Sequence, residues 1–420
     1  MDIASGMYDP RPALRSLNFG FTRLFLMTMY AYDFIAFQSF LVVQRSLVFY
    51  SFSALNKNAP QPQRATLDFE QNLSDTVSSV MTSTQILNLL TTHGCVDITP
   101  SIDLSLCSNH PVAAGGLGDI FVGRLRTGTR VAIKVFRSYD VSNELAGKYH
   151  KAAAREIHTW SKCQHPNVVE LIGLTVFREC LAMVSEWEDN GNMPHYLSRN
   201  PTVNRCQLVS RVGVTCLYPS GVLTPDSQSK SICAGVLYLH NMDIVHGDLK
   251  GANVLIDRNG APRLTDFGCA SFLSATLHFT QTNTGPSYSV RWTAPEILRG
   301  KTGHTKEGDI YALGMTILEA FTTEVPFSGR SEISLYRHIL DRKKTPSRPG
   351  SIIPERSILG NVLWAILMSC WSYNPAGRPT AQDVHTLASQ VFALLREMLP
   401  LSPESLQVIA EEPEDDDHDD

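Results

Sequence analysis

The chain has 420 residues, 43% of them hydrophobic, so it is long enough for two or three domains of ordinary size. Its net charge is −5, but the last ten residues hold eight carboxylates, which leaves about +3 for the rest of the chain. A nearly neutral body without a basic block argues against a nucleic-acid partner. The nine cysteines form no Cys-x-x-Cys pair, which argues against zinc clusters and disulfide frameworks and favours a cytoplasmic protein with reduced thiols.

The first 60 residues form an apolar N-terminal extension, and residues 17–55 are rich in aliphatic and aromatic side chains. About twenty apolar residues would span a bilayer, but Asp33 lies mid-segment, where a charge costs roughly 2.5–3.5 kcal/mol. Three alternatives stay open: a helix packed on the rest of the protein, a membrane anchor that leaves the remaining chain in the cytosol, or a non-native extension. Residues 61–106 are expected to be a linker with a weak helix, and residues 397–420 a disordered acidic tail.

Between residues 107 and 396 the pattern changes from short β-branched segments to long amphipathic ones, separated by turns. Strands that come early and helices that come late predict an α+β fold with two lobes: a small β-sheet lobe with one helix and a larger helical lobe.

The first chemical signal is a glycine-rich turn, Ala113-Ala114-Gly115-Gly116-Leu117-Gly118, between two predicted strands. Glycines let backbone N–H groups approach phosphate oxygens without obstruction by a Cβ atom, although glycine hairpins are common for other reasons. Lys134 follows in an apolar strand, where a lysine needs an anionic partner. Glu156, on the next predicted helix, could provide one.

The strongest signal is the run Ile244–Leu255, in which apolar residues flank a loop with Asp248, Lys250 and Asn253. Phosphoryl transfer needs a group that orients the attacking hydroxyl, a group that neutralises phosphate charge and a metal ligand. Asp266, in Asp-Phe-Gly, supplies a second oxygen ligand of the type that Mg²⁺ prefers. Further along, Arg378 is expected to pair with Glu296 of an Ala-Pro-Glu motif as a buried bidentate bridge.

In this order the motifs resemble those of the eukaryotic protein kinase family. The resemblance implies ATP and Mg²⁺ as cofactors, protein substrates, Asp248 as catalytic base and Lys250 at the γ-phosphate. It places Asn253 and Asp266 at the metal, Lys134 at the α- and β-phosphates and Glu156 on Lys134. It also implies that the nucleotide is contacted by Gly115, Gly116, Gly118, Ile120, the gatekeeper Ser185 and the hinge residue Glu186.

The motifs combine features of two branches of the family. Lys250 resembles serine/threonine kinases, whereas Arg291-Trp292-Thr293-Ala294-Pro295-Glu296 resembles tyrosine kinases. This mixture is typical of the tyrosine-kinase-like group, so we expect transfer to Ser and Thr hydroxyls in intracellular signalling. The alternative is a pseudokinase or scaffold that keeps the fold and acts by binding.

Three positions depart from the family pattern. Ala113 replaces the first glycine of the phosphate loop, which should weaken nucleotide binding without abolishing it. Gly247 replaces the arginine that usually receives an activation-loop phosphate, so we expect activity that does not depend strongly on such phosphorylation. Residues 211–230 contain Pro219 and Pro225 and cannot continue the expected long helix. They are either a surface insertion or the product of an unremoved intron.

Overall fold

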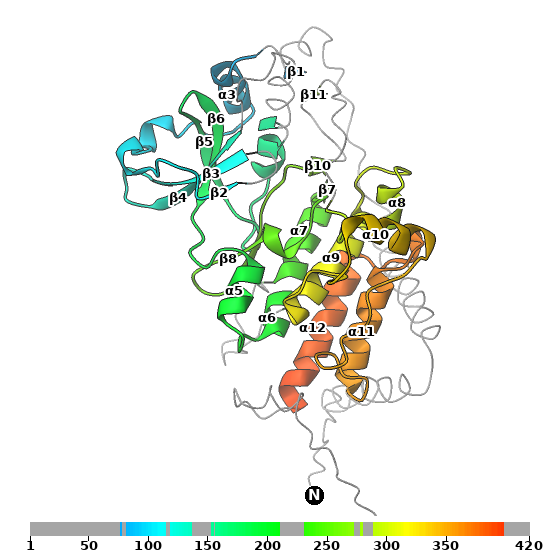
Figure 1. Ribbon diagram of the computed structural model, residues 1–420. Helices are drawn as coiled ribbons and strands as arrows, with labels where there is room; N and C mark the ends of the chain where they lie inside the picture. Colours follow the sequence, from blue (N-terminus) through cyan, green and yellow to red (C-terminus); the bar gives the residue numbers. More distant parts are fainter. Residues whose placement is uncertain are drawn as a thin grey trace, which may run out of the picture.

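The structure is a computed structural model that describes residues 76–77, 81–114, 118–136, 153–154, 156–210, 231–272, 278–279 and 289–398. Two lobes meet side by side, with a sheet in one and mainly helices in the other (Figure 1). The predicted two-lobed α+β fold is therefore confirmed. The apolar extension, the insertion 211–230 and the acidic tail lie outside the described residues. Within the described part of the chain, no helix combines the length and apolarity that a bilayer span requires.

The small lobe is built on a five-stranded antiparallel sheet in the order β2-β3-β4-β6-β5. Its strands are β2 (Ala113–Ala114), β3 (Gly118–Arg124), β4 (Arg130–Phe136), β5 (Leu171–Phe177) and β6 (Cys180–Glu186). Burial alternates along β4, where Val131, Ile133 and Val135 are buried in one hydrophobic cluster and Ala132 and Lys134 point to the other face. The sheet therefore presents Lys134 on the face opposite to that cluster.

A segment that precedes the sheet packs onto it. Helix α3 (Ser83–Thr92) begins with a capping box in which Thr82 and Gln85 exchange hydrogen bonds, and Leu90 is fully buried. Two short 3₁₀ turns, η2 (Thr99–Ser101) and η3 (Leu104–Leu106), follow. The sequence predicts a linker with a weak helix over residues 61–106. The helix is present as α3, but from residue 81 onward the segment is a packed part of the small lobe, because the apolar face of α3 contacts β5 and β6.

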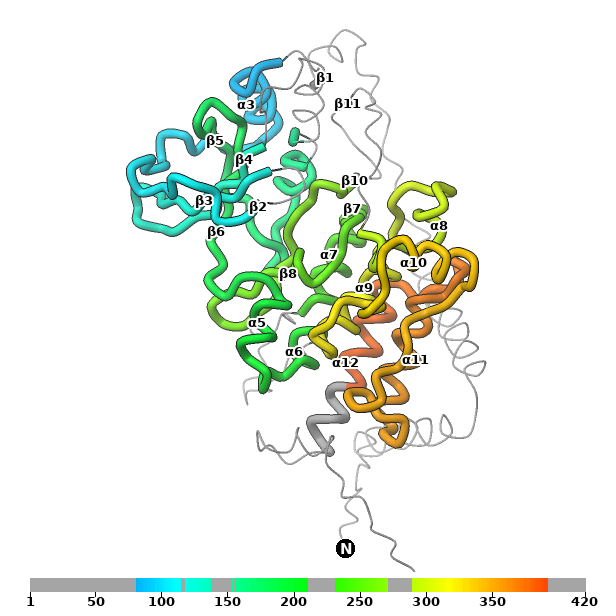
Figure 2. Tube along the Cα trace, viewed as in Figure 1, coloured from blue at the N-terminus to red at the C-terminus, as the bar shows by residue number. Residues whose placement is uncertain are grey.

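The large lobe is organised around helix α9 (Lys306–Thr322), in which 13 of 17 residues are buried. Gly314 permits close packing there, since an added Cβ would lie 2.8 Å from Cys370. The other α-helices are α5 (Met193–Arg199), α6 (Arg205–Val209), α7 (Ile232–Asn241), α8 (Pro295–Leu298), α10 (Glu332–Tyr336), α11 (Ile358–Cys370) and α12 (Ala381–Met398), with a π-helical turn at Arg337–Asp341 and a 3₁₀ turn at Pro375–Gly377. Figure 2 shows α9, α11 and α12 gathered in this lobe.

Short strand pairs flank the loops that carry the predicted catalytic and metal-binding residues. Strand β7 (Ile244–Val245) pairs with β10 (Ser271–Phe272), and β8 (Val254–Ile256) pairs with β9 (Pro262–Leu264). The 3₁₀ turn η5 (Gly251–Asn253) precedes β8, and β1 (Thr76–Val77) pairs with β11 (His278–Phe279). The residues 246–253 and 265–270 therefore lie between paired strands that hold both ends of each loop.

Two separately capped helices flank residues 211–230. Helix α6 ends at Val209, and α7 begins after Ser231, whose side chain accepts a hydrogen bond from the Ala234 amide. Ser210 and Ser231 are both buried, and α6 and α7 pack into one hydrophobic cluster. The helix break predicted from the prolines is therefore present, and both of its flanks belong to the core of the large lobe.

Candidate active site

The register of the sheet brings the predicted nucleotide residues to one face. Ile120 on β3 lies opposite Lys134 on β4, and Ala132 lies opposite Ser185 on β6. Directly paired residues share a face, and so do residues two apart on a strand, so Ile120, Lys134 and Ser185 face the same side. Ser185 is buried, and Glu186 follows it at the end of the strand. Gly115 and Gly116 lie outside the described residues.

Gly118 is required by the sheet itself. A Cβ atom at this position would lie 2.5 Å from the carbonyl oxygen of Val135 on the neighbouring strand. The close approach of β3 to β4 therefore explains this glycine, whatever contact its amide makes with a phosphate.

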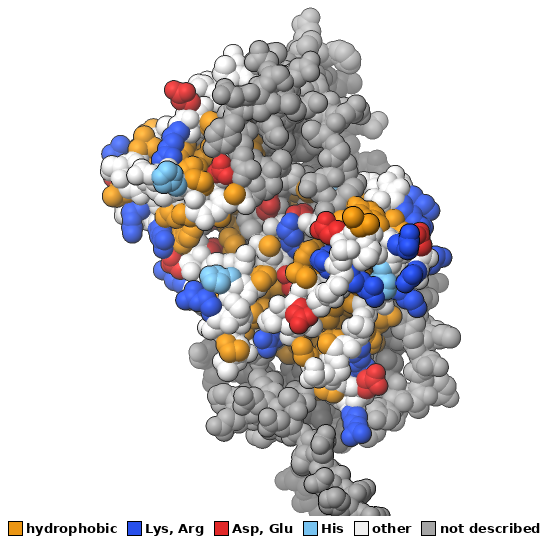
Figure 3. All heavy atoms as spheres, viewed as in Figure 1, with side chains coloured by type: hydrophobic (Ala, Val, Ile, Leu, Met, Phe, Trp, Pro, Cys, Tyr) orange, Lys and Arg blue, Asp and Glu red, His pale blue; other side chains and the backbone are white. Residues whose placement is uncertain are grey.

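Lys134 is the centre of a charged cluster between the lobes. Its Nζ atom lies 2.8 Å from Glu156 Oε1 and 2.8 Å from Asp266 Oδ1. Burial alone would lower the pKa of Lys134, but the two carboxylates outweigh this effect and raise the pKa above its ordinary value. Lys134 is thus a fixed cation. Figure 3 shows charged side chains of both signs in the hollow between the lobes.

Asp266 is held in an unusual backbone conformation. Its φ is +65°, in the left-handed region that non-glycine residues rarely adopt. The next residue, Phe267, is fully buried and stacks on Trp160, with ring centroids 5.9 Å apart, and also contacts His246. This packing fixes the backbone on the C-terminal side of Asp266, which keeps the carboxylate directed at Lys134. Lys134 in turn lowers the pKa of Asp266, against the opposing effect of burial.

The loop 246–253 holds three polar side chains in contact. Asp248 Oδ2 accepts hydrogen bonds from Lys250 Nζ at 2.7 Å and from Asn253 Nδ2 at 3.0 Å. Asn253 Nδ2 also bonds to the backbone oxygen of Asp248 at 2.8 Å, and Lys250 donates to Ser289 Oγ at 2.9 Å. The three residues predicted to carry the chemistry therefore form one network, and Ser289 joins it from the segment before the Ala-Pro-Glu motif.

A buried carboxylate on α9 positions the start of this loop. Asp309 accepts hydrogen bonds from the backbone amides of His246 and Gly247, each at 2.8 Å, and contacts His240 Nε2 at 3.0 Å. Burial alone would raise the pKa of Asp309, but these partners outweigh it and lower the pKa. Asp309 therefore links α9 to the start of the catalytic loop.

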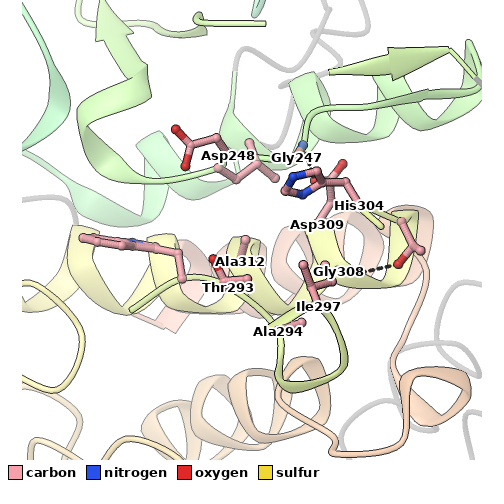
Figure 4. Close-up of a pocket in the computed structure, with 12 residues that line it drawn as sticks. Gly247, Asp248, Thr293, Ala294, Ile297, His304, Gly308, Asp309 and Ala312 are labelled. Atoms are coloured by element: carbon pink, nitrogen blue, oxygen red, sulfur yellow. Dashed lines mark hydrogen bonds between the residues drawn. The ribbon is translucent and has the colours of Figure 1, made fainter. Parts of the chain in front are cut away.

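Gly247 occupies a conformation that suits glycine. Its φ is +81°, and an added Cβ would lie 2.7 Å from the carbonyl oxygen of Cys269 and 3.1 Å from the ring of His304. Figure 4 shows His304 beside Gly247, in a pocket that Asp309, Ile297 and Ala312 also line, with the Asp248 carboxylate directed away from it. The backbone at position 247 therefore favours glycine and would be strained by the arginine that the family usually has there.

A second carboxylate on α9 holds the other end of the loop. Glu319 Oε2 accepts hydrogen bonds from the Gly251 amide at 2.8 Å and from Trp292 Nε1 at 3.0 Å. Glu319 is not among the residues predicted from the sequence. Its position in the apolar stretch 310–320 is a signal for such a role, because a buried carboxylate needs partners.

The predicted bridge between Glu296 and Arg378 is confirmed. The two terminal nitrogens of the Arg378 guanidinium each lie 2.7 Å from a different carboxylate oxygen of Glu296, and Arg378 is 2% exposed. The same guanidinium donates to the backbone oxygens of Ser372 and Glu307. This bridge fixes α8, and with it the Ala-Pro-Glu segment, to the body of the large lobe.

Comparison with known proteins identifies relatives of this arrangement. The protein kinase domain family matches residues 108–388. Mitogen-activated protein kinase kinase kinase A of Dictyostelium discoideum is 27% identical over 290 residues, which cover 66% of this chain and 28% of that protein. Mitogen-activated protein kinase kinase kinase 2 of Arabidopsis thaliana is 27% identical over 353 residues, 81% of this chain and 49% of that protein.

A third relative, serine/threonine/tyrosine-protein kinase HT1 of Arabidopsis thaliana, is 25% identical over 272 residues, 65% of this chain and 63% of that protein. The chain thus spans less than two-thirds of the length of each of these relatives. The chain belongs to the protein kinase family, and its motifs and relatives place it in the tyrosine-kinase-like group.

Proposed function

We propose that the chain is an active protein kinase that transfers the γ-phosphate of ATP to Ser and Thr hydroxyls of proteins. The observation that carries this proposal is the joint placement of Lys134, Glu156 and Asp266 in one ion-paired cluster. A scaffold would have no need to keep a lysine buried between two carboxylates, because taking charges out of water is costly even when they are paired.

Each polar group has a chemical task in this proposal. Asp248 accepts the proton of the attacking hydroxyl, and its oxygen is oriented for that task by Lys250 and Asn253. Lys250 carries a positive charge to the side of the transferred phosphoryl group, and Lys134 does so at the α- and β-phosphates. Because catalysis of phosphoryl transfer rests on positioning and charge, these fixed contacts are the protein's main contribution.

The donor atoms fit magnesium. Among the described residues no group of three or more His, Cys, Asp or Glu side chains could hold a metal by itself. Mg²⁺ needs few protein ligands when phosphate oxygens and waters complete its shell. Asn253 directs its amide nitrogen to Asp248, which leaves its oxygen available, and Asp266 offers a carboxylate. Mg²⁺ bound there would neutralise charge on the phosphates of ATP.

The preference for Ser and Thr rests on Lys250 and Ser289. Lys250 connects the base Asp248 to the Ser289 hydroxyl, so the catalytic loop and the segment 289–296 form one surface beside the base. The relatives include a serine/threonine-protein kinase and a serine/threonine/tyrosine-protein kinase, both of Arabidopsis thaliana. We infer that the chain transfers phosphate to Ser and Thr residues of protein substrates. Transfer to tyrosine would contradict this preference.

The test is transfer of labelled phosphate by the full-length protein, with Asp248→Asn as the matched variant. The expected result is activity in the wild type and a loss of about a hundredfold or more in the variant, which is the usual size of a general-base effect. Both proteins should gain thermal stability from Mg·ATP, because Asp248 is not assigned to nucleotide binding. Three peptides that differ only in a central Ser, Thr or Tyr measure the preference. A wild type that binds Mg·ATP and transfers nothing would establish the pseudokinase alternative.

We also propose a cytoplasmic location. All eight cysteines among the described residues are free thiols, as expected in a reducing compartment. Cell fractionation of the full chain beside a variant without residues 17–55 tests this location and the membrane-anchored alternative. Recovery of only the full chain in the membrane fraction would favour the anchor.

A further inference from the structure

The helix that carries Glu156 is covered on more than one side. All five residues from Glu156 to Trp160 are buried, although they make more than a full turn of helix and include the polar His158 and Thr159. A helix that packs on a sheet normally keeps a polar face in water. Another element of the chain must therefore lie against the outer side of this helix.

That element is α3 together with the residues that follow it. The rings of His93 and His158 are in edge-to-face contact with centroids 6.3 Å apart, and Lys162 Nζ donates to the His93 carbonyl at 3.4 Å. Apolar residues of both elements belong to the same buried cluster: Ile86, Leu87 and Leu90 on one side, and Ala153, Ala154, Ile157 and Trp160 on the other.

The inner side of the same helix contacts the active site at two points. Glu156 binds Lys134 at 2.8 Å, and Trp160 stacks on Phe267, the neighbour of Asp266. A displacement of the helix would therefore separate the ion pair and remove the packing of Phe267 together. The helix lies between α3 and the groups that bind phosphate and metal.

The segment after α3 is fixed independently to the sheet. The Leu174 amide donates to the Val96 carbonyl at 2.7 Å, and the Ile98 amide donates to the Leu174 carbonyl at 2.8 Å. Gly173 permits this approach, since a Cβ atom there would lie 2.6 Å from the Val96 carbonyl oxygen. Because the segment is attached at β5, α3 can hold the helix against the sheet without moving with it.

We propose that α3 is a positioning element for the active site, which holds the helix of Glu156 in the arrangement that pairs Glu156 with Lys134. This inference rests on the proposed kinase function. It goes beyond the family assignment, because α3 precedes residues 108–388, which are the part matched by the kinase family. The residues that act are Ile86 and Leu90, which are fully buried and belong to the same hydrophobic cluster as Ile157 and Trp160 of the helix.

The test compares two isoleucines of the small lobe in the full-length protein. Ile86→Ala removes packing from the cluster that α3 shares with the Glu156 helix, whereas Ile102→Ala removes packing from the separate cluster that also contains Val131 and Ile133. Both residues are nearly inaccessible, so both variants should lower the denaturation midpoint by similar amounts. Measured where both are fully folded, kcat should fall about tenfold or more in Ile86→Ala and stay within about twofold of wild type in Ile102→Ala. Ile86→Val should recover most of the lost rate.

A double variant separates positioning from general stability. If α3 acts mainly through Glu156, then Ile86→Ala should slow Glu156→Gln by much less than it slows the wild type, whereas independent effects would multiply. An Ile86→Ala protein that is folded and keeps its kcat, or effects that multiply, would overturn the inference. Amide hydrogen exchange over residues 156–163 gives a readout without catalysis: it should be faster in Ile86→Ala and unchanged in Ile102→Ala. If the wild type transfers no phosphate, the kinase proposal fails while this exchange measurement still decides whether α3 holds the helix.

Discussion

Asp309 provides the most direct test of how the catalytic loop is held, through the substitution Asp309→Asn. The carboxylate accepts two backbone N–H bonds with one oxygen each, and one of those oxygens also contacts His240. An amide keeps one acceptor oxygen but places an NH₂ group against a backbone N–H. The backbone N–H of either His246 or Gly247 then loses its acceptor, and residue 309 is only 2% exposed, so water cannot easily replace it.

The cost follows from that geometry. A hydrogen bond to a charged group contributes about 1.5–3 kcal/mol, and a buried unsatisfied donor costs about 1–3 kcal/mol. We therefore expect a loss of about 3–5 kcal/mol in the free energy of unfolding, a large part of the 5–15 kcal/mol of a typical domain. Since the amides of residues 246 and 247 directly precede Asp248, kcat should fall as well, while the KM for ATP should change less.

The matched control is Glu307→Gln, which removes a carboxylate from the same first turn of α9, where the side chain is exposed. It should cost less than about 1 kcal/mol, the usual effect of a charge at a helix N-terminus. Urea denaturation and steady-state kinetics measure both variants. Equal stability and kcat in Asp309→Asn and Glu307→Gln would refute the assigned role of Asp309.

Three further predictions concern Gly247 and Glu188. Gly247 has φ +81° and lies close to the Cys269 carbonyl, so Gly247→Ala should lower the free energy of unfolding by about 1–3 kcal/mol. Urea denaturation measures this loss, and a variant as stable as the wild type would contradict it. Gly247 also lacks the arginine side chain that would bind an activation-loop phosphate. Phosphatase treatment of the wild type should therefore leave its phosphate-transfer rate within about twofold of the untreated rate. Loss of activity after this treatment would show that the kinase depends on phosphorylation. Burial raises the pKa of Glu188 to about 7, against the opposing effect of Arg263. The folded protein then binds a proton that the unfolded chain releases above about pH 4.3, so the free energy of unfolding should fall by about 1–3 kcal/mol as pH rises from 5 to 8. Glu188→Gln should remove this part of the decline, and an unchanged pH profile in the variant would contradict the assignment.

Much of the site could be predicted because its residues are chemically conspicuous in the sequence. Lys134 in an apolar strand, and Asp248, Lys250 and Asn253 in a short polar loop, are unusual enough to indicate chemistry. The structure brings these residues and Asp266 together, and the β-strand register explains how Ile120 and Ser185 reach the same face as Lys134. The alternation of side chains along a strand was enough to predict this shared face, because residues two apart on a strand point to the same side of the sheet.

The groups that support the site could not be predicted in the same way. Asp309 and Glu319 are carboxylates in a helix, and their partners are backbone amides of a loop about 60–70 residues earlier, which no local pattern identifies. Helix α3 was underestimated because its Ser and Thr residues are weak helix formers, while the Thr82–Gln85 capping box and burial against β5 and β6 supply the missing stability. The left-handed conformation of Gly247 likewise depends on contacts with Asp309 and Cys269.

The spacing of the two carboxylates of α9 limits which mutations the helix can accept. Asp309 and Glu319 are ten residues apart, which corresponds to about 15 Å along the helix axis. Replacing a buried side chain between them with another apolar one of similar volume leaves that spacing intact, so such substitutions should be accepted at most positions of this stretch. Inserting or deleting one residue would shift one carboxylate by about 1.5 Å and rotate it by about 100° relative to the other. One end of the catalytic loop would then lose its acceptor, so the length of α9 should be far more constrained than its composition.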